Sequence, residues 1–195
     1  MNFIAHRINT SEELQNVPAE YGIEVDLRDY GDDLVLTHEP FQSGEKFEDY
    51  LKSYQHGTMI LNIKSERIEF RVLELLQKYG IDDYFFLDST FPMIYLLGTK
   101  EEKKIALRYS ELEKMDTILE MKGKVDWVWV DCFTRLPLDC KGYETLKDAG
   151  FKLCLVSPEL QGREEDIQPY KEYLSKENII FDAICTKMHN ISKWR

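Results

Sequence analysis

The feature that most constrains the fold of this chain is a regular alternation of short apolar segments with longer amphipathic ones. Eight apolar segments are typical of buried strands: 3–5, 23–27, 59–63, 84–87, 105–108, 127–130, 153–156 and 183–185. The segments between them are typical of helices: 11–15, 46–54, 66–79, 92–97, 110–121, 141–149 and 164–177, with a short tail at 188–193. Strands that alternate with helices favour a parallel sheet with helical crossovers.

Eight such units predict an α/β fold, a compact TIM (β/α)8 barrel that forms one domain over residues 1–195 and ends in a truncated helix. An open doubly wound sheet is the alternative, which the lack of a glycine-rich phosphate loop after the first strand weakens. A further short strand is expected at 34–37, at the mouth of the barrel. Gly80 and Gly98 are predicted to end helices.

Two carboxylates share one face of the predicted strand 23–27. Side chains alternate along a strand, so Glu24 and Asp26 point the same way, with Cα atoms about 7 Å apart. Like charges this close repel unless a proton or a cation lies between them. Hard oxygen ligands favour Mg²⁺, Mn²⁺ or Ca²⁺ over Zn²⁺, so a divalent cation of that class is the simplest solution. Neutralisation by Arg7, Arg28 or Lys64 is the alternative.

Two histidines each follow an apolar strand-like segment in the same part of the chain. His6 comes after the first predicted strand, and His38 comes after the short strand 34–37. Residues that end the strands of a barrel converge on one face of it. Imidazole changes its charge near neutral pH, so His6 and His38 could serve as an acid and base pair. A purely structural role is the alternative for each of them.

Composition limits the partners of the chain. With 195 residues, of which 43% are hydrophobic, it can bury a sizeable core. The net charge of −11 argues against nucleic acid and anionic membrane surfaces, because the field of the protein would repel both. No apolar stretch approaches the length of a membrane span and no leader is visible, so a cytoplasmic location is expected. The oligomeric state is left open.

Three motifs follow one another in the order and spacing of a known family. They are Ile4-Ala5-His6-Arg7, Ile23-Glu24-Val25-Asp26-Leu27 and Leu34-Val35-Leu36-Thr37-His38. Together they resemble the N-terminal signature of the glycerophosphodiester phosphodiesterases, a family of the phosphatidylinositol-specific phospholipase C-like barrels. The segment 61–64 stands in the place of that family's Glu-x-Lys strand, and 181–186 resembles its last strand.

The resemblance implies catalytic and substrate-binding roles for four residues. The histidines that match His6 and His38 act in the family as a general acid and base pair. The cations that match Arg7 and Lys64 hold the phosphate. Phosphoryl transfer concentrates charge on the nonbridging oxygens, so two cations would stabilise the transition state while two imidazoles move protons.

The resemblance also implies a metal site, from which this chain departs at one position. The family's carboxylates that match Glu24 and Asp26 bind a divalent cation, expected here to be Mg²⁺ or Ca²⁺, with Mn²⁺ as the next candidate. Asn62 replaces the third carboxylate, and its amide oxygen can ligate but brings no charge. The Glu-Asn-Thr that follows the family's His-Arg pair is matched to 15–17, and the family's insertion after His38 is missing.

These motifs predict a metal-dependent phosphoric diester hydrolase that acts on a small glycerophosphodiester or sugar-phosphodiester. Two alternatives stay open. One is a catalytically degenerate barrel that binds a phosphorylated metabolite or a partner protein. The other is a lyase that stops at a cyclic phosphate.

Overall fold

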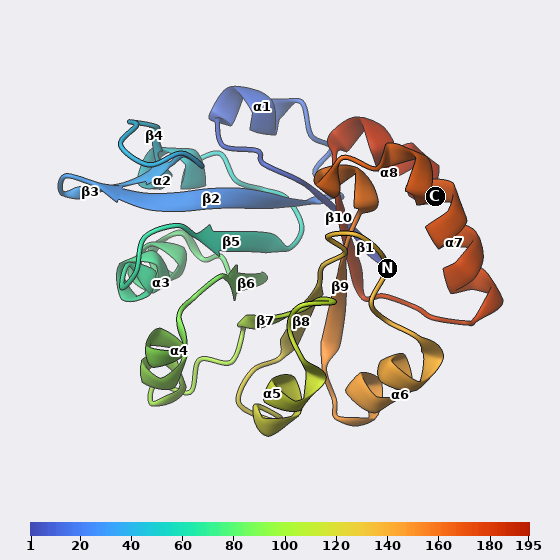
Figure 1. Cartoon of the computed structure of the whole chain (residues 1–195). Helices are drawn as coiled ribbons and strands as arrows, with labels where there is room; N and C mark the ends of the chain where they lie inside the picture. The colour runs from blue at the N-terminus through green and yellow to red at the C-terminus, as the bar shows by residue number, and fades with distance from the viewer. The chain divides into compact units, whose positions relative to one another are not determined.

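The computed structural model describes residues 1–195, and strands and helices alternate along it as predicted (Figure 1). The chain forms two compact units. One is Ile4–Glu102, and the other consists of Met1–Phe3 and Lys103–Arg195. Strand β1 (Asn2–Ala5) contributes residues to both units. The single domain over residues 1–195 stays a prediction.

The first unit, Ile4–Glu102, contains most of the strands that the motifs occupy. Its strands are the end of β1, β2 (Gly22–Tyr30), β3 (Asp33–Leu36), β4 (Glu45–Lys46), β5 (Met59–Ile63) and β6 (Tyr84–Leu87). Its helices are α1 (Ser11–Gln15), α2 (Phe47–Leu51), α3 (Glu69–Tyr79) and α4 (Phe91–Gly98).

Strand β2 is the centre of the sheet in this unit. Its first half pairs in parallel with β1 on one side and with β5 on the other, and β5 pairs in parallel with β6. Its second half pairs with β3, which returns antiparallel, and β4 extends β3. The extra strand expected at 34–37 is thus present as β3. All five residues of β5 are buried, which is typical of a parallel strand covered on both faces.

The second unit holds four parallel strands in the order β10-β9-β8-β7. They are β7 (Ala106–Tyr109), β8 (Trp127–Val130), β9 (Lys152–Val156) and β10 (Ala183–Thr186). The helices are α5 (Met115–Glu120), α6 (Cys140–Asp148), α7 (Ile167–Lys176) and α8 (Ile191–Trp194), with 3₁₀ turns at Pro158–Gln161, Glu164–Asp166 and Met188–Asn190. Helix α8 has only 4 residues, as the prediction of a truncated last helix required.

Some helix boundaries differ from the prediction. Gly80 ends α3 in the left-handed conformation, with φ 67°, as expected. Gly98 is instead the last residue of α4, and its φ lies outside the left-handed region. The helix predicted over 110–121 begins only at Met115, because the Ser110 hydroxyl accepts backbone N–H groups two and three residues later and holds a turn. No helix of the structure has both the length and the apolar character needed to cross a membrane.

Gly22 begins β2 at a point where a side chain has no room. A Cβ atom there would lie 2.4 Å from the carbonyl oxygen of Thr58, which accepts the N–H of Ile23. We expect Gly22→Ala to lower the free energy of unfolding by about 2 kcal/mol, because the backbone must shift at this contact. Gly98→Ala is the matched control, since a Cβ at Gly98 meets nothing within 4 Å. It should stabilise the chain by about 0.5 kcal/mol, and equal urea midpoints for the two variants would contradict the expectation.

Candidate functional site

Glu24 and Asp26 form an acidic pair on β2, and both are fully buried, with 0% of each residue exposed. The register of β2 with β5 places Asp26 opposite Asn62. The Asn62 amide Nδ2 donates to Glu24 Oε1 at 2.8 Å. The structure therefore brings together the three residues that the sequence indicated as metal ligands, all within the unit Ile4–Glu102.

Two buried oxygen atoms of this cluster accept no hydrogen bond. They are Asp26 Oδ1 and Asn62 Oδ1. A buried acceptor without a donor costs about 1–3 kcal/mol, so such atoms are rare in folded proteins unless something else satisfies them. Two carboxylates and an amide oxygen fit a hard divalent cation, and the two orphaned oxygens are where it would bind. No group of three or more His, Cys, Asp or Glu side chains is placed to hold a metal, so the third ligand here would be the amide.

The pKa of Glu24 is raised because its hydrogen bonds do not offset the cost of burying its charge. Burial, and after it the charge of Asp26, raise the pKa of Glu24 to about 7. The hydrogen bond from Asn62 and the N–H of Arg7 lower it and only partly offset the effect of burial. The pKa of Glu24 therefore lies well above the usual range of a carboxyl group.

The loop after β1 brings Arg7 and His6 to the acidic pair. The backbone N–H of Arg7 donates to Glu24 Oε2 at 2.8 Å, and Arg7 Nε lies 3.5 Å from Asp26 Oδ2. Arg7 has a φ of 58°, a left-handed conformation that costs a residue with a side chain roughly 1–2 kcal/mol. Such outliers collect at functional sites, where the surrounding contacts hold them. His6 Nε2 lies 3.8 Å from Glu24 Oε2.

Lys64 follows β5 and faces two carboxylates. Its Nζ lies 3.7 Å from Asp26 Oδ1 and 3.5 Å from Asp88 Oδ2. The first distance is an ion-pair distance and is too long for a hydrogen bond, so Asp26 Oδ1 still has no donor. Asp88 comes directly after β6.

His38 follows β3, and a main-chain hydrogen bond of the residue before it ties this strand end to Asp26. The N–H of the preceding residue, Thr37, donates to the carbonyl oxygen of Asp26 at 3.0 Å. The His38 ring, however, bonds to the neighbouring Glu39, with Nδ1 2.7 Å from Oε1, and this contact lowers the pKa of Glu39. Of the two predicted histidines, only His6 has a ring within 4 Å of the acidic pair.

Arg28 holds two strand ends together. Its guanidinium donates to the carbonyl oxygen of His38 from Nε at 3.2 Å and Nη2 at 2.9 Å, and to that of Lys64 from Nη1 at 2.8 Å. Arg28 was one of the cations that could have neutralised the acidic pair. The structure shows it bonded to main-chain carbonyls instead, at the places where His38 and Lys64 leave their strands.

Asn9 contacts the acidic pair and was missed from the sequence. Its Nδ2 donates to Asp26 Oδ2 at 3.0 Å, and its Oδ1 accepts the N–H of Asp26 at 2.9 Å. The asparagine matched from the resemblance, Asn16, instead bonds Glu12 O at the end of α1. The available signal was position, because Asn9 comes directly before the capping box of Thr10 and Glu13 that starts α1.

Neighbouring elements fix the loop that carries these residues. The buried hydroxyl of Tyr50, on α2, donates to Ile8 O at 2.9 Å. Glu45, on β4, accepts the N–H of Ser11 at 2.7 Å. The hairpin extension that follows His38 therefore also supports the loop after His6.

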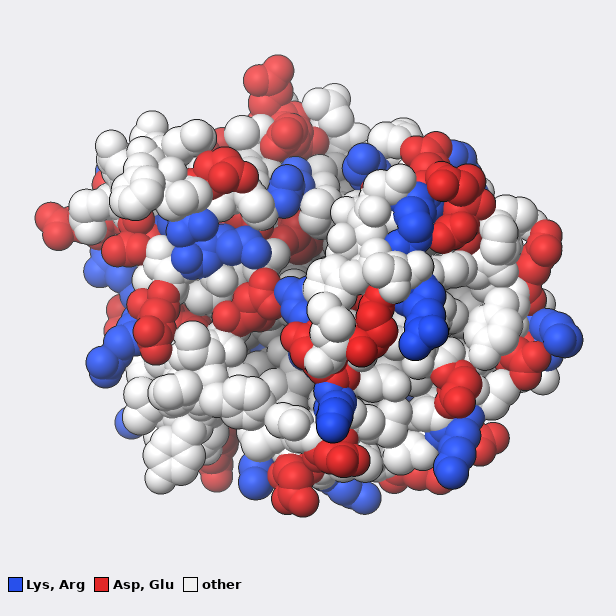
Figure 2. Space-filling model, viewed as in Figure 1, with Lys and Arg blue, Asp and Glu red and all other residues white.

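The surface of Ile4–Glu102 carries charges of both signs. In Figure 2, basic side chains on this part of the molecule lie beside acidic ones. Lys46 pairs with Asp33 at 2.7 Å and Lys52 with Asp49 at 2.5 Å. Exposed pairs of this kind contribute little to stability, because solvent screens them. Arg7 and Lys64 differ from these surface cations because both face the buried Asp26.

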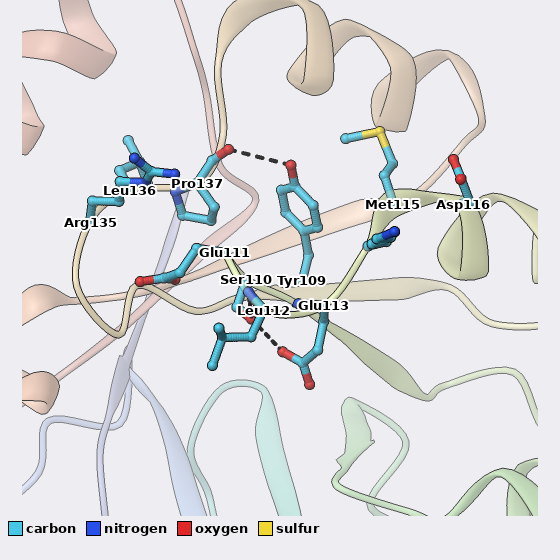
Figure 3. Close-up of a pocket in the computed structure, with 11 residues that line it drawn as sticks. Tyr109, Ser110, Glu111, Leu112, Glu113, Met115, Asp116, Arg135, Leu136 and Pro137 are labelled. Atoms are coloured by element: carbon cyan, nitrogen blue, oxygen red, sulfur yellow. Dashed lines mark hydrogen bonds between the residues drawn. The ribbon is translucent and has the colours of Figure 1, made fainter.

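A cavity of about 690 Å³ lies in the second unit and is lined by residues 109–116 and 135–137 (Figure 3). The Tyr109 hydroxyl donates to Pro137 O at 3.3 Å, and the Ser110 hydroxyl donates to Glu113 Oε2 at 2.6 Å. None of the residues that the sequence assigned to the site lines this cavity. It therefore gives no support to the predicted chemistry.

Comparisons with known proteins give matches only among solved structures. No family model and no curated protein sequence matches the chain. A glycerophosphoryl diester phosphodiesterase from Parabacteroides distasonis is similar, with a TM-score of 0.65 and 10% identity over 99% of this chain and 85% of that one. Predicted enzymes of the same name from Silicibacter pomeroyi (TM-score 0.61, 13% identity, 95% and 89% covered) and Agrobacterium tumefaciens (0.59, 12%, 95% and 93%) also match. The chain has the fold of the glycerophosphoryl diester phosphodiesterases.

That fold is a TIM barrel, so the predicted fold class is confirmed and the open doubly wound alternative is excluded. The fold of this chain is thus similar to that of these proteins, at low sequence identity. The match extends over almost its whole length, although the motifs quoted for the family lie only in and next to β1, β2, the antiparallel β3, β5 and β10. At 10% to 13% identity, the similarity shows the fold alone, and the roles of single residues have to be argued from their geometry.

Proposed function

We propose that this chain is a metal-dependent phosphoric diester hydrolase that acts on a small glycerophosphodiester or sugar-phosphodiester. The observation that carries the proposal is the pair of buried oxygens without donors, Asp26 Oδ1 and Asn62 Oδ1, beside Glu24. The fold shared with phosphodiesterases supports it. Mg²⁺ or Ca²⁺ is the cation that this set of oxygen ligands favours, with Mn²⁺ next.

The cation would be held by Glu24, Asp26 and Asn62. When bound, it would neutralise charge on the nonbridging oxygens of the phosphodiester. Arg7 and Lys64, at 3.5 Å and 3.7 Å from Asp26, would bind the same oxygens from the protein side. Asn9 would keep the Asp26 carboxylate oriented through its two bonds to that residue.

We assign the two proton transfers to His6 and His38. The attacking hydroxyl loses its proton as the new O–P bond forms, and the leaving oxygen gains a proton as its P–O bond breaks. Glu39 would hold the Nδ1 proton of His38 and leave Nε2 for the transfer. Where the attacking hydroxyl belongs to the substrate, the first product is a cyclic phosphate, and phosphorus NMR distinguishes it from a hydrolysed monoester.

Calorimetric titration of the metal-free protein with Mg²⁺, Mn²⁺ and Ca²⁺ tests the proposal. We expect saturable binding at one site by the wild type and binding at least about 100-fold weaker in Asp26→Asn, which removes one of only two ligand charges. Asp32→Asn, in the exposed turn before β3, makes the same charge change as a control and should bind like the wild type. Lack of binding by the wild type up to millimolar metal would overturn the metal-dependent mechanism.

A second candidate function is a barrel that binds a phosphorylated metabolite or a partner protein without turnover. The observation in its favour is that Arg7 and Lys64 already lie within 4 Å of Asp26, so positive charge faces the acidic pair from the protein itself. Turnover of any phosphodiester that depends on His6 would reject this candidate.

A further inference from the structure

The Lys64 ammonium lies between two carboxylates that differ in kind. Asp26 is fully buried, and Lys64 Nζ lies 3.7 Å from its Oδ1, the oxygen without a donor. The side chain of Asp88 is 28% exposed, and its Oδ2 lies 3.5 Å from the same Nζ. Lys64 therefore has a second partner at nearly equal distance on the more exposed side.

The backbone accounts for the place of Asp88. Strand β6 pairs with β5 so that Leu87 lies opposite Asn62, and Asp88 is the next residue. Asp88 adopts a φ of 63°, a left-handed conformation that is uncommon for a residue with a side chain. The strand register and this turn at its end together bring the Asp88 carboxylate to the ammonium of Lys64.

A cation on Asp26 Oδ1 and the ammonium in its present place are in conflict. A Mg²⁺, Mn²⁺ or Ca²⁺ ion would bind that oxygen at roughly 2.1–2.5 Å. The ammonium, 3.7 Å from the same oxygen, would then face a divalent charge at close range. Lys64 must turn away from Asp26 when the cation binds, and Asp88 is the carboxylate within reach.

We propose that Asp88 is a positioning residue that takes the Lys64 ammonium from Asp26 when a divalent cation binds the acidic pair. This inference rests on the proposed function of the same site. In the metal-free state the ammonium is shared between Asp26 and Asp88. In the metal-bound state it pairs with Asp88 alone and stays beside the phosphate position.

Substitutions at Lys64 and at Asp88 should change metal affinity in opposite directions. Lys64 competes with the cation for Asp26, so Lys64→Gln should bind metal more tightly, although it removes a phosphate-binding charge. Asp88→Asn should bind metal more weakly, because its Lys64 has only Asp26 as a partner. The effect of Asp88 should therefore depend on the presence of Lys64.

Mn²⁺ titration by calorimetry of four proteins tests this: the wild type, Lys64→Gln, Asp88→Asn and the double variant. We expect affinity about tenfold higher in Lys64→Gln and about tenfold lower in Asp88→Asn than in the wild type. In the double variant, the change at Asp88 should alter the affinity of Lys64→Gln by less than about twofold. Asp32→Asn controls for the loss of one negative charge, and Asp88→Glu should restore part of the wild-type affinity.

Three results would overturn the inference. Wild-type affinity in Asp88→Asn would show that Asp88 does not hold Lys64. An undiminished effect of Asp88→Asn in the Lys64→Gln background would show that Asp88 acts on the metal directly. Weaker binding by Lys64→Gln would show that Lys64 does not compete for Asp26. In each case the wild type still binds Mn²⁺ and the proposed function stands, whereas a wild type that does not bind it would remove both.

Discussion

Replacement of His38 by alanine is expected to lower phosphodiester turnover about 100- to 10,000-fold, the usual contribution of a general acid or base. The His38 ring bonds only to Glu39 and its side chain is 36% exposed, so its loss should leave the fold intact. Turnover should fall through kcat, because the group that transfers the proton is lost. Steady-state kinetics of the variant and the wild type measures this effect.

His6→Ala should lower phosphodiester turnover by a similar factor. His6 Nε2 lies 3.8 Å from Glu24, so this variant should also change metal affinity, whereas His38→Ala should not. His189→Ala is the control, because His189 is exposed on the short turn before α8 and lies in the other unit of the chain. Unchanged turnover in both His6→Ala and His38→Ala would refute the acid and base assignment.

The metal-free protein should become less stable as the pH rises, because Glu24 ionises in a buried position. The Glu24→Gln variant should lack this contribution to the loss. The pKa of Glu24 is raised from 4.5 to about 7 in the folded chain, mainly by burial. Protonated Glu24 contributes its full stabilising effect below the pKa of the unfolded chain, near 4.5. This contribution is lost as the pH rises through about 7, because the folded state must then bury a charge. The loss amounts to about 3 kcal/mol.

Urea unfolding of the wild type and Glu24→Gln at pH 4.5 and pH 8 measures this effect. From pH 4.5 to pH 8, the free energy of unfolding of the variant should rise by about 3 kcal/mol relative to that of the wild type. Exposed carboxylates with lowered pKa, such as Glu48 and Asp49, act in the opposite direction, but they are present in both proteins and cancel in the difference. Millimolar Mn²⁺ at pH 8 should remove most of the difference by stabilising the ionised wild type. A difference that does not change with pH would contradict the raised pKa.

Elements with a strong local pattern were predictable from the sequence. The strand predicted at 59–63 is β5 to the residue, because a parallel strand buried on both faces is a continuous apolar run. Helix α1 was also predicted with its observed bounds, since its capping box marks its start. Strand β4 has only 2 residues and no pattern of its own, so nothing in the sequence indicated it.

In the candidate site, too, only the features with a local sequence pattern were predictable. The acidic pair on β2 followed from alternation along a single strand, which is a local property. The two bonds from Asn9 to Asp26 span 17 residues, and the bonds from Arg28 reach one strand end 10 residues away and another 36 away. Such contacts depend on the strand register and on loop geometry. Residue type did not determine whether Arg28 would face the carboxylates or the backbone.

Arg28 also has a consequence for the entropy of substrate binding. A guanidinium carries its N–H groups in one rigid plane, so a single side chain can fix two carbonyl groups at a set separation, which a lysine could not do. Here the two carbonyls belong to His38 and Lys64, a candidate proton-transfer group and a candidate phosphate-binding group. Their spacing is thus determined before a ligand binds, and fewer conformations are lost on binding. A residue outside the reacting atoms can in this way improve affinity through preorganisation.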